Sequence, residues 1–117
     1  MGMKEQPHGW YTDCRTLWIL SILLDEVRIR CRYRRRGNHV LDYTVQLEMW
    51  QEESWRPIVR YDNAHGVCHC DTIHPDGTQD KMPIHRGDAN SNFTWAIKEV
   101  RASWQSQRAR FLAEIQP

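Results

Sequence analysis

The segment from Asp62 to Asp76 concentrates side chains that can move protons or bind metal ions. Its fifteen positions hold three histidines, three aspartates and two cysteines, in the run DNAHGVCHCDTIHPD. Histidine changes its charge near neutral pH, so it can act as a general acid or base beside a carboxylate that orients it. Imidazole and carboxylate groups are also ligands for Zn²⁺ and other transition metals. The segment therefore predicts a site for proton transfer or for a metal ion.

Four of these residues form the predicted catalytic group. If residues 67–74 are a strand, His69 and Asp71 share one of its faces, about 6.6 Å apart along it. Asp62 and His65 lie at the entrance of the same hairpin and can fold toward His69. We expect His65 and His69 to transfer protons while Asp62 and Asp71 orient them. The weaker alternative is a divalent metal bound by His65, His69 and Asp71; because H-x₃-H-x-D is no recognised metal signature, no cofactor is otherwise expected.

The two cysteines of the segment decide which face of the predicted strand is buried. Cys68 and Cys70 lie opposite His69 and Asp71, and free cysteine is among the most buried residue types. We therefore expect the thiols to face the core as ordinary buried side chains, and His69 and Asp71 to lie on the open face. The non-functional alternative is that Asp62 and Asn63 form an Asx turn and the histidines line a polar sheet surface.

Arginine is concentrated in a second segment, residues 28–36, which holds six of them. The planar guanidinium matches phosphate oxygens, so a strand of this kind could bind RNA. Arg28 and Arg34 have acidic neighbours in the predicted sheet. The predicted nucleic-acid-binding residues are those without such neighbours, joined by one arginine further along: Arg30, Arg32, Arg35, Arg36 and Arg60. The alternative is an ordinary exposed arginine face with no ligand.

Alternating apolar and polar residues predict a β-hairpin formed by residues 27–35 and 40–50. A two-residue loop at Gly37-Asn38 would pair Tyr33 with Asp42, opposing apolar and polar side chains. A three-residue loop that includes His39 pairs like with like, so we prefer it. The resulting pairs are Tyr33–Tyr43, Cys31–Val45, Ile29–Leu47, Arg34–Asp42 and Arg28–Glu48.

Further strands are predicted at residues 55–62, 67–74 and 78–84. In the first of them Trp55, Pro57, Val59 and Tyr61 form an apolar face, with Pro57 at a bulge or strand start. Residues 15–25 are apolar and fit either a helix or a buried strand.

Apolar residues recur at intervals of three and four from about Ser91 onward, which predicts an amphipathic helix over residues 91–116. Asn90 or Ser91 is the expected N-cap. The predicted inner face comprises Phe93, Ile97, Val100, Trp104, Phe111 and Ile115. The other face carries Trp95 and several alanines, and it indicates a surface for a homodimer or for another partner.

The predicted fold class is α+β, an antiparallel meander of four or five strands with a long C-terminal helix packed on one face. Residues 1–117 form a single domain, with a loose N-terminus at residues 1–14 and the sheet within residues 27–84. The formal charge of +1 excludes a strong overall attraction to nucleic acid or anionic membrane. No apolar run approaches the roughly 20 residues of a membrane span. Irregularly placed cysteines and the lack of a secretory signal favour reduced thiols in the cytoplasm.

The run VRYDNAH at residues 59–65, followed by His69-x-Asp71 and by HPDG at residues 74–77, resembles a group of small prokaryotic proteins. Among named families, the run resembles the TumE-type toxins of bacterial toxin–antitoxin modules, and the resemblance covers roughly residues 30–84. It implies a cytoplasmic protein with a cognate antitoxin partner, and it supplies no catalytic residue.

These observations together predict a small toxin-like protein that cleaves RNA by His/Asp acid–base chemistry. The alternative from another class is a non-enzymatic module that binds nucleic acid or protein.

Overall fold

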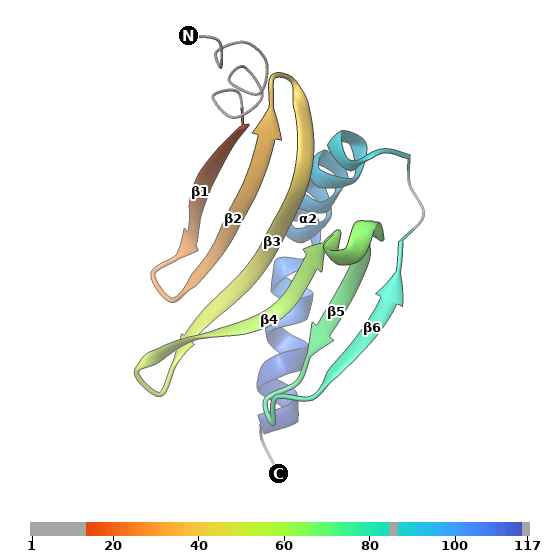
Figure 1. Cartoon of the computed structure of the whole chain (residues 1–117). Coiled ribbons are helices and arrows are strands. Elements are labelled where there is room, and N and C mark those ends of the chain that lie inside the picture. Colours follow the sequence, from red (N-terminus) through yellow and green to blue (C-terminus); the bar gives the residue numbers. More distant parts are fainter. Residues whose placement is uncertain (1–13, 85–86, 116–117) are drawn as a thin grey trace, which may run out of the picture.

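The computed structural model describes residues 14–84 and 87–115, apart from the side chains of Cys14 and His65. The N-terminal residues 1–13 and residue 116 of the predicted helix lie outside this range. Six strands, a 3₁₀ turn and a long helix follow one another along the chain (Figure 1). They are β1 (Cys14–Leu24), β2 (Val27–Arg36), β3 (His39–Gln51), β4 (Ser54–Asp62), η2 (Ala64–Gly66), β5 (His69–Ile73), β6 (Gln79–Pro83) and α2 (Ala89–Ile115).

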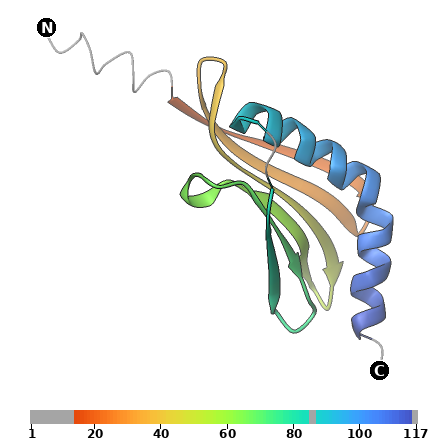
Figure 2. The same ribbon diagram turned by 90° about the vertical axis from the view of Figure 1, so that its right-hand side faces the viewer.

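The six strands form one antiparallel sheet in which every strand lies beside its neighbours in the chain, from β1 at one edge to β6 at the other. The helix α2 runs along one face of this twisted sheet, mainly over β3 and β4 (Figure 2). The α+β class and the packed C-terminal helix are therefore confirmed. The sheet has one strand more than the upper prediction, because residues 15–25 form the strand β1 and not a helix.

The predicted pairing of β2 with β3 is confirmed at all five predicted pairs. The predicted three-residue loop is wrong, because Arg36 pairs with His39 across a two-residue turn. Gly37 supplies the left-handed backbone of that turn, with φ of 57°. The register then shifts between Arg34 and Arg35, which leaves Leu41 as the extra residue of a β-bulge. A bulge thus reconciles the Gly-Asn turn with the like-to-like pairing.

A second bulge in β4 corrects the predicted apolar face of that strand. Pro57 lies opposite Glu48 whereas Val59 lies opposite Leu47, so Ile58 is the extra residue. The bulge reverses the side-chain alternation, and Trp55 and Pro57 therefore share a face with Glu48, away from α2. Tyr61 and Val59 keep their place on the helix-facing side.

The core lies between the sheet and α2. Tyr43 is 1% exposed, and the rings of Tyr43 and Tyr33 both pack against Phe93, with centroids 5.4 and 4.8 Å away. The helix buries Phe93, Ala96, Val100 and Phe111 in this layer, which confirms the predicted inner face. The placement of Trp95 on the outer face is wrong, because its ring meets Tyr61 edge-on at 5.5 Å and packs against the core.

The start of α2 differs from prediction by two residues. The carboxylate of Asp88 accepts a hydrogen bond of 2.8 Å from the backbone N–H of Ser91, which is the contact of an N-cap. This bond lowers the pKa of Asp88. Asn90 instead holds the β2–β3 turn, accepting a bond from the Val40 N–H and donating one to the Asn38 carbonyl. Within the described residues, no helix is long and apolar enough to span a membrane.

Candidate functional site

The face of the sheet that points away from α2 carries polar side chains, and several of them are buried. Gln46, Glu48, His69 and Asp71 are between 2% and 8% exposed. His69 and Asp71 lie on this face, as predicted, while Cys68 and Cys70 face the helix-covered core. The expectation that this face is open is wrong at β5, because long side chains from the neighbouring strands cover it.

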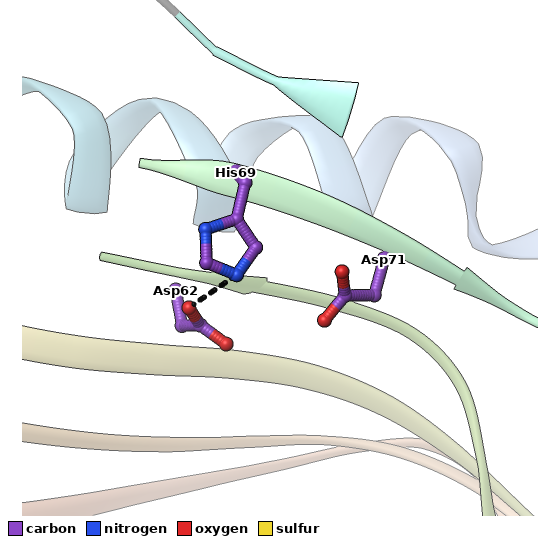
Figure 3. A group of neighbouring side chains, drawn as sticks. All are labelled: Asp62, His69 and Asp71. Carbon is purple, nitrogen blue, oxygen red and sulfur yellow. Dashed lines mark ion pairs between the residues drawn. The ribbon is translucent and has the colours of Figure 1, made fainter. Parts of the chain in front are cut away.

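His69 is held through both of its ring nitrogens. It lies directly opposite Asp62 in the β4–β5 ladder, and its Nε2 is 2.9 Å from Asp62 Oδ1 (Figure 3). Its Nδ1 is 3.0 Å from the carbonyl oxygen of Val67. A carbonyl can only accept, so Nδ1 carries a hydrogen. Both ring nitrogens of His69 are therefore engaged.

Asp62 is positioned by the end of β4 and by the turn that follows. Its Oδ1 also accepts a hydrogen bond of 3.1 Å from the backbone N–H of Ala64. The neighbouring Asn63 bridges back to β3, accepting a bond from the Tyr43 N–H and donating one to the Leu41 carbonyl. The Asx turn considered above is therefore present at Asp62, and it fixes the carboxylate that His69 contacts.

Asp71 is as deeply buried as Glu48, at 2% exposure. Lys81 Nζ lies 2.9 Å from its Oδ1, and Arg60 Nη1 lies 3.9 Å from its Oδ2. Oδ1 nevertheless accepts no hydrogen bond of good geometry from any described residue. Arg60 is also bound by Gln46, whose Oε1 accepts from its Nε at 2.8 Å. Two cations thus offset the charge of Asp71, while its Oδ1 is left without a hydrogen bond of good geometry within the described part of the chain.

Asp62, His69 and Asp71 together offer one ligand atom each, and these atoms lie within 4.8 Å of one another. Their side chains point into the same space between β4 and β5 (Figure 3). This set differs from the predicted metal site by one residue, because Asp62 takes the position proposed for His65, whose side chain lies outside the described structure. A histidine that binds a metal usually donates its other ring N–H to a carbonyl or carboxylate, and His69 Nδ1 has such a partner in Val67. Lys81 and Arg60 compete with a metal ion for Asp71.

A cleft of about 470 Å³ adjoins this cluster at Asp62. Its walls come from the ends of β2, β3 and β4 and from η2: Arg32, Leu41, Asp42, Tyr43, Thr44, Asp62, Asn63, Ala64 and Gly66. Asp62 therefore belongs both to the cleft wall and to the buried contact with His69. The cleft brings Arg32, a predicted nucleic-acid contact, together with Asp62, a predicted catalytic residue.

Two of the predicted nucleic-acid-binding arginines have acidic partners in the structure. Arg30 and Arg32 were expected to lack acidic neighbours, and this is wrong: Arg30 lies 3.0 Å from Glu48 and Arg32 lies 3.6 Å from Asp42. Both contacts run diagonally across the β2–β3 ladder, within reach of a long side chain. Arg35 and Arg36 are half-buried near the β2–β3 turn.

Glu48 organises the rest of this face. Its carboxylate is 3% exposed and accepts hydrogen bonds from Arg28 at 2.6 Å, from Arg30 and from the Gln46 amide. The Arg28 guanidinium also lies over the Trp55 ring, 3.9 Å from its centroid. One buried acid thus pairs with two of the six arginines that the sequence places in β2.

Cys68 is buried and Cys70 is half-buried, and both pack against the core as predicted. Tyr43 Oη is 2.6 Å from Cys68 Sγ. Burial raises the pKa of both thiols, and it raises that of Cys31 to about 11. The thiolate is the reactive form of cysteine, so these groups are poor nucleophiles.

Three residues of the site were missed in the sequence: Lys81, Gln46 and Glu48. Lys81 could have been found from the pairing of β5 with β6, because that pairing places it opposite Asp71. Gln46 and Glu48 occupy alternate polar positions of β3, where alternation predicts exposure, so no sequence signal indicated their burial.

A protein-family model, described as a domain of unknown function (DUF7718), matches residues 3–117. The chain belongs to the DUF7718 family. Comparison of this DUF7718 chain with curated proteins gives no match, and comparison with solved structures gives none either. The family description names no activity, so the toxin-type resemblance, the antitoxin partner and the cytoplasmic location stay predictions.

Proposed function

We propose that this DUF7718 protein binds the RNA backbone in the cleft beside Asp62 and cleaves it by proton transfer. The observation that carries the proposal is the shared cleft wall. Arg32 and Asp62 line one cleft, and Asp62 is held from behind by the buried His69. An anion-binding cation and an oriented carboxylate are the two groups that metal-independent cleavage beside a 2′-hydroxyl needs first.

Arg32 is suited to hold a phosphate of the substrate. Its side chain is 42% exposed, and its contact with Asp42 is loose at 3.6 Å. A phosphodiester that enters the cleft can therefore compete for the guanidinium without breaking a short, buried ion pair.

Asp62 and His69 exchange the roles expected from the sequence. His69 is 8% exposed and both of its nitrogens are engaged, whereas Asp62 reaches the cleft wall. Asp62 accepts the proton of a ribose 2′-hydroxyl as the 2′-oxygen bonds to phosphorus. The bond to the 5′-oxygen breaks, that oxygen takes a proton from water, and the hydroxide so formed removes the proton from Asp62. His69 is a positioning residue that holds the carboxylate.

The test is cleavage of a labelled RNA oligonucleotide, with DNA of the same sequence as a control. RNA should yield 2′,3′-cyclic phosphate ends, and DNA should stay intact because it lacks the 2′-hydroxyl. Asp62→Asn keeps an oxygen for the Ala64 N–H but cannot accept the proton, so the rate should fall on the order of 100-fold or more. Asp80→Asn, at an exposed acid of β6, is the matched control. Equal rates for Asp62→Asn and wild type would overturn the assignment of Asp62.

A second candidate is metal-assisted cleavage, favoured by the three ligand atoms within 4.8 Å of one another. In this version Asp62, His69 and Asp71 hold a divalent ion beside the cleft. Calorimetric titration with Zn²⁺ or Mn²⁺ should then show binding to wild type and a loss of affinity in Asp71→Asn. Cleavage that survives treatment with a chelator removes the metal version. Cleavage that is lost with chelator and restored by the ion removes the metal-free version.

The binding-module and toxin alternatives separate from the enzyme in two further measurements. RNA that binds in a salt-dependent way without being cut, with weaker binding in Arg32→Ala, would favour a non-enzymatic module. Expression of wild type and Asp62→Asn in a bacterium tests toxicity. Equal growth of the two cultures would remove the toxin hypothesis and leave RNA cleavage to be decided in vitro.

A further inference from the structure

The two edges of the sheet are built differently. The edge strand β6 is short, five residues in all, and its sequence QDKMP contains two charges and a proline. These are devices by which native sheets prevent an edge from pairing with another chain. The other edge strand, β1, is eleven residues long and carries no charge or proline between Thr16 and Leu24. One edge is protected against pairing and the other is not.

β1 also exposes much of the apolar surface of the molecule. Among the described residues, eight large apolar side chains are exposed, and five of them lie on this strand. Trp18, Leu20 and Ile22 are 55–61% exposed, and Ile19 and Leu24 are 39% and 47% exposed. Each is typical of a buried strand, and a contiguous exposed group of them marks an interaction surface.

We propose that two copies of the DUF7718 chain pair through β1, antiparallel and centred on Leu20, so that their sheets become continuous. In this register Leu20 lies opposite its own copy and Trp18 lies opposite Ile22. Arg15 then lies opposite Asp25 of the second copy, twice over because of the two-fold symmetry. Arg15 and Asp25 are exposed charges of opposite sign at the two ends of the strand. Shifting the pairing by two residues in either direction loses both charge pairs.

This arrangement satisfies the backbone as well as the side chains. Within one chain β1 is hydrogen-bonded to β2 only, so the outward N–H and C=O groups have no strand partner among the described residues. A second β1 supplies one. Opposed residues share a face, so Trp18, Leu20 and Ile22 of both copies form one apolar patch on the face away from α2. The inference rests on β1 alone and does not depend on the proposed function.

The first test is the mass of the full chain in solution, by light scattering after size-exclusion chromatography. Wild type should run at twice 14.0 kDa. Leu20→Lys places two ammonium groups against each other on the two-fold axis, so it should shift the protein to monomer. Met82→Lys is the matched control on β6, where the side chain is 63% exposed, and it should stay dimeric. Circular dichroism checks that both variants remain folded. A monomeric wild type, or a dimeric Leu20→Lys, would overturn the proposal.

The second test addresses the register. Arg15→Glu should weaken the dimer, and Arg15→Glu combined with Asp25→Arg should restore it. Leu20→Cys should form an intermolecular disulfide on oxidation, because directly opposed strand residues lie within disulfide range. Failure of both would overturn the Leu20-centred pairing. A dimer broken by Ala109→Arg, on the exposed face of α2, and not by Leu20→Lys would instead assign the interface to the helix.

Discussion

The two faces of the sheet use opposite means to bury their side chains. The face toward α2 is mainly apolar, and its buried Cys68 thiol is hydrogen-bonded to the hydroxyl of Tyr43. The face away from α2 buries carboxylates and an imidazole under arginine and lysine side chains. Burying charge is costly unless each charge is paired, so this face adds less stability than an apolar layer would. The difference indicates that the face toward α2 contributes more to the stability of the fold than the face away from it.

The strongest test of this contrast is a cavity on the helix-facing side. Phe111 is fully buried, so Phe111→Ala should lower the free energy of unfolding by about 3–5 kcal/mol. Urea denaturation measures the change. Gln105→Ala, at an exposed position of the same helix, is the control and should stay within about 0.5 kcal/mol of wild type. A Phe111→Ala loss as small as that of the control would mean that α2 is not the main cover of the core.

A smaller loss is expected on the polar face. Glu48→Ala leaves Arg28 and Arg30 without their shared carboxylate, and it should cost about 2–3 kcal/mol, below the range for a fully buried pair because Arg30 is 45% exposed and keeps water. Glu26→Ala, which removes an exposed acid from the β1–β2 turn, is the control for charge alone. If Glu48→Ala and Glu26→Ala lower the free energy of unfolding by the same small amount, the Glu48 network adds nothing to stability. A loss as large as that of Phe111→Ala would erase the energetic contrast between the faces.

The smallest effect should depend on pH, at the place where α2 is tied to the edge of the sheet. His74 Nε2 is 2.8 Å from Asp80 and its Nδ1 is 2.5 Å from Glu114 at the end of α2. The hydrogen bond to Asp80 and then that to Glu114 raise the pKa of His74 above its ordinary value of 6.5. Protonated His74 therefore stabilises the folded state fully below about pH 6.5, and this stabilisation is lost as pH rises through the higher folded-state pKa.

Thermal unfolding of wild type and His74→Gln across this range measures the effect. The difference in Tm should be largest near pH 6 and should shrink above the folded-state pKa. The same comparison in an Asp80→Asn, Glu114→Gln background should show no such pH dependence. A constant difference at every pH would mean that His74 acts by packing and not by charge.

Much of the fold was predictable because alternation and register are local properties. The pairing of Tyr33 with Tyr43 follows from matching apolar with apolar residues, and the structure confirms it. The two bulges were not predictable in detail, because each reconciles a turn or a proline with pairing further along the ladder. β1 was ambiguous for a related reason. Its residues are apolar on both faces at an edge that α2 leaves uncovered, so no period distinguished a strand from a helix.

The candidate site was predictable in composition and not in arrangement. The meeting of Asp62 with His69 follows from the hairpin that joins β4 to β5. The placement of Lys81 against Asp71 depends on a neighbour from another strand, and so do the diagonal contacts of Arg30 and Arg32. Side-chain partners of this kind are chosen by distance in space, which spacing along the chain does not reveal.

The amino-acid sequence by itself determined the α+β class, the strand pairing, the helix face and the group of ionisable residues, because these depend on periodicity and residue type. Only the tertiary structure decided which acids are buried, which arginines they neutralise, and that Asp62 rather than His69 reaches the cleft. Those outcomes depend on the curvature of the sheet and the bulges within it, which bring β2, β4, β5 and β6 within side-chain reach across one face.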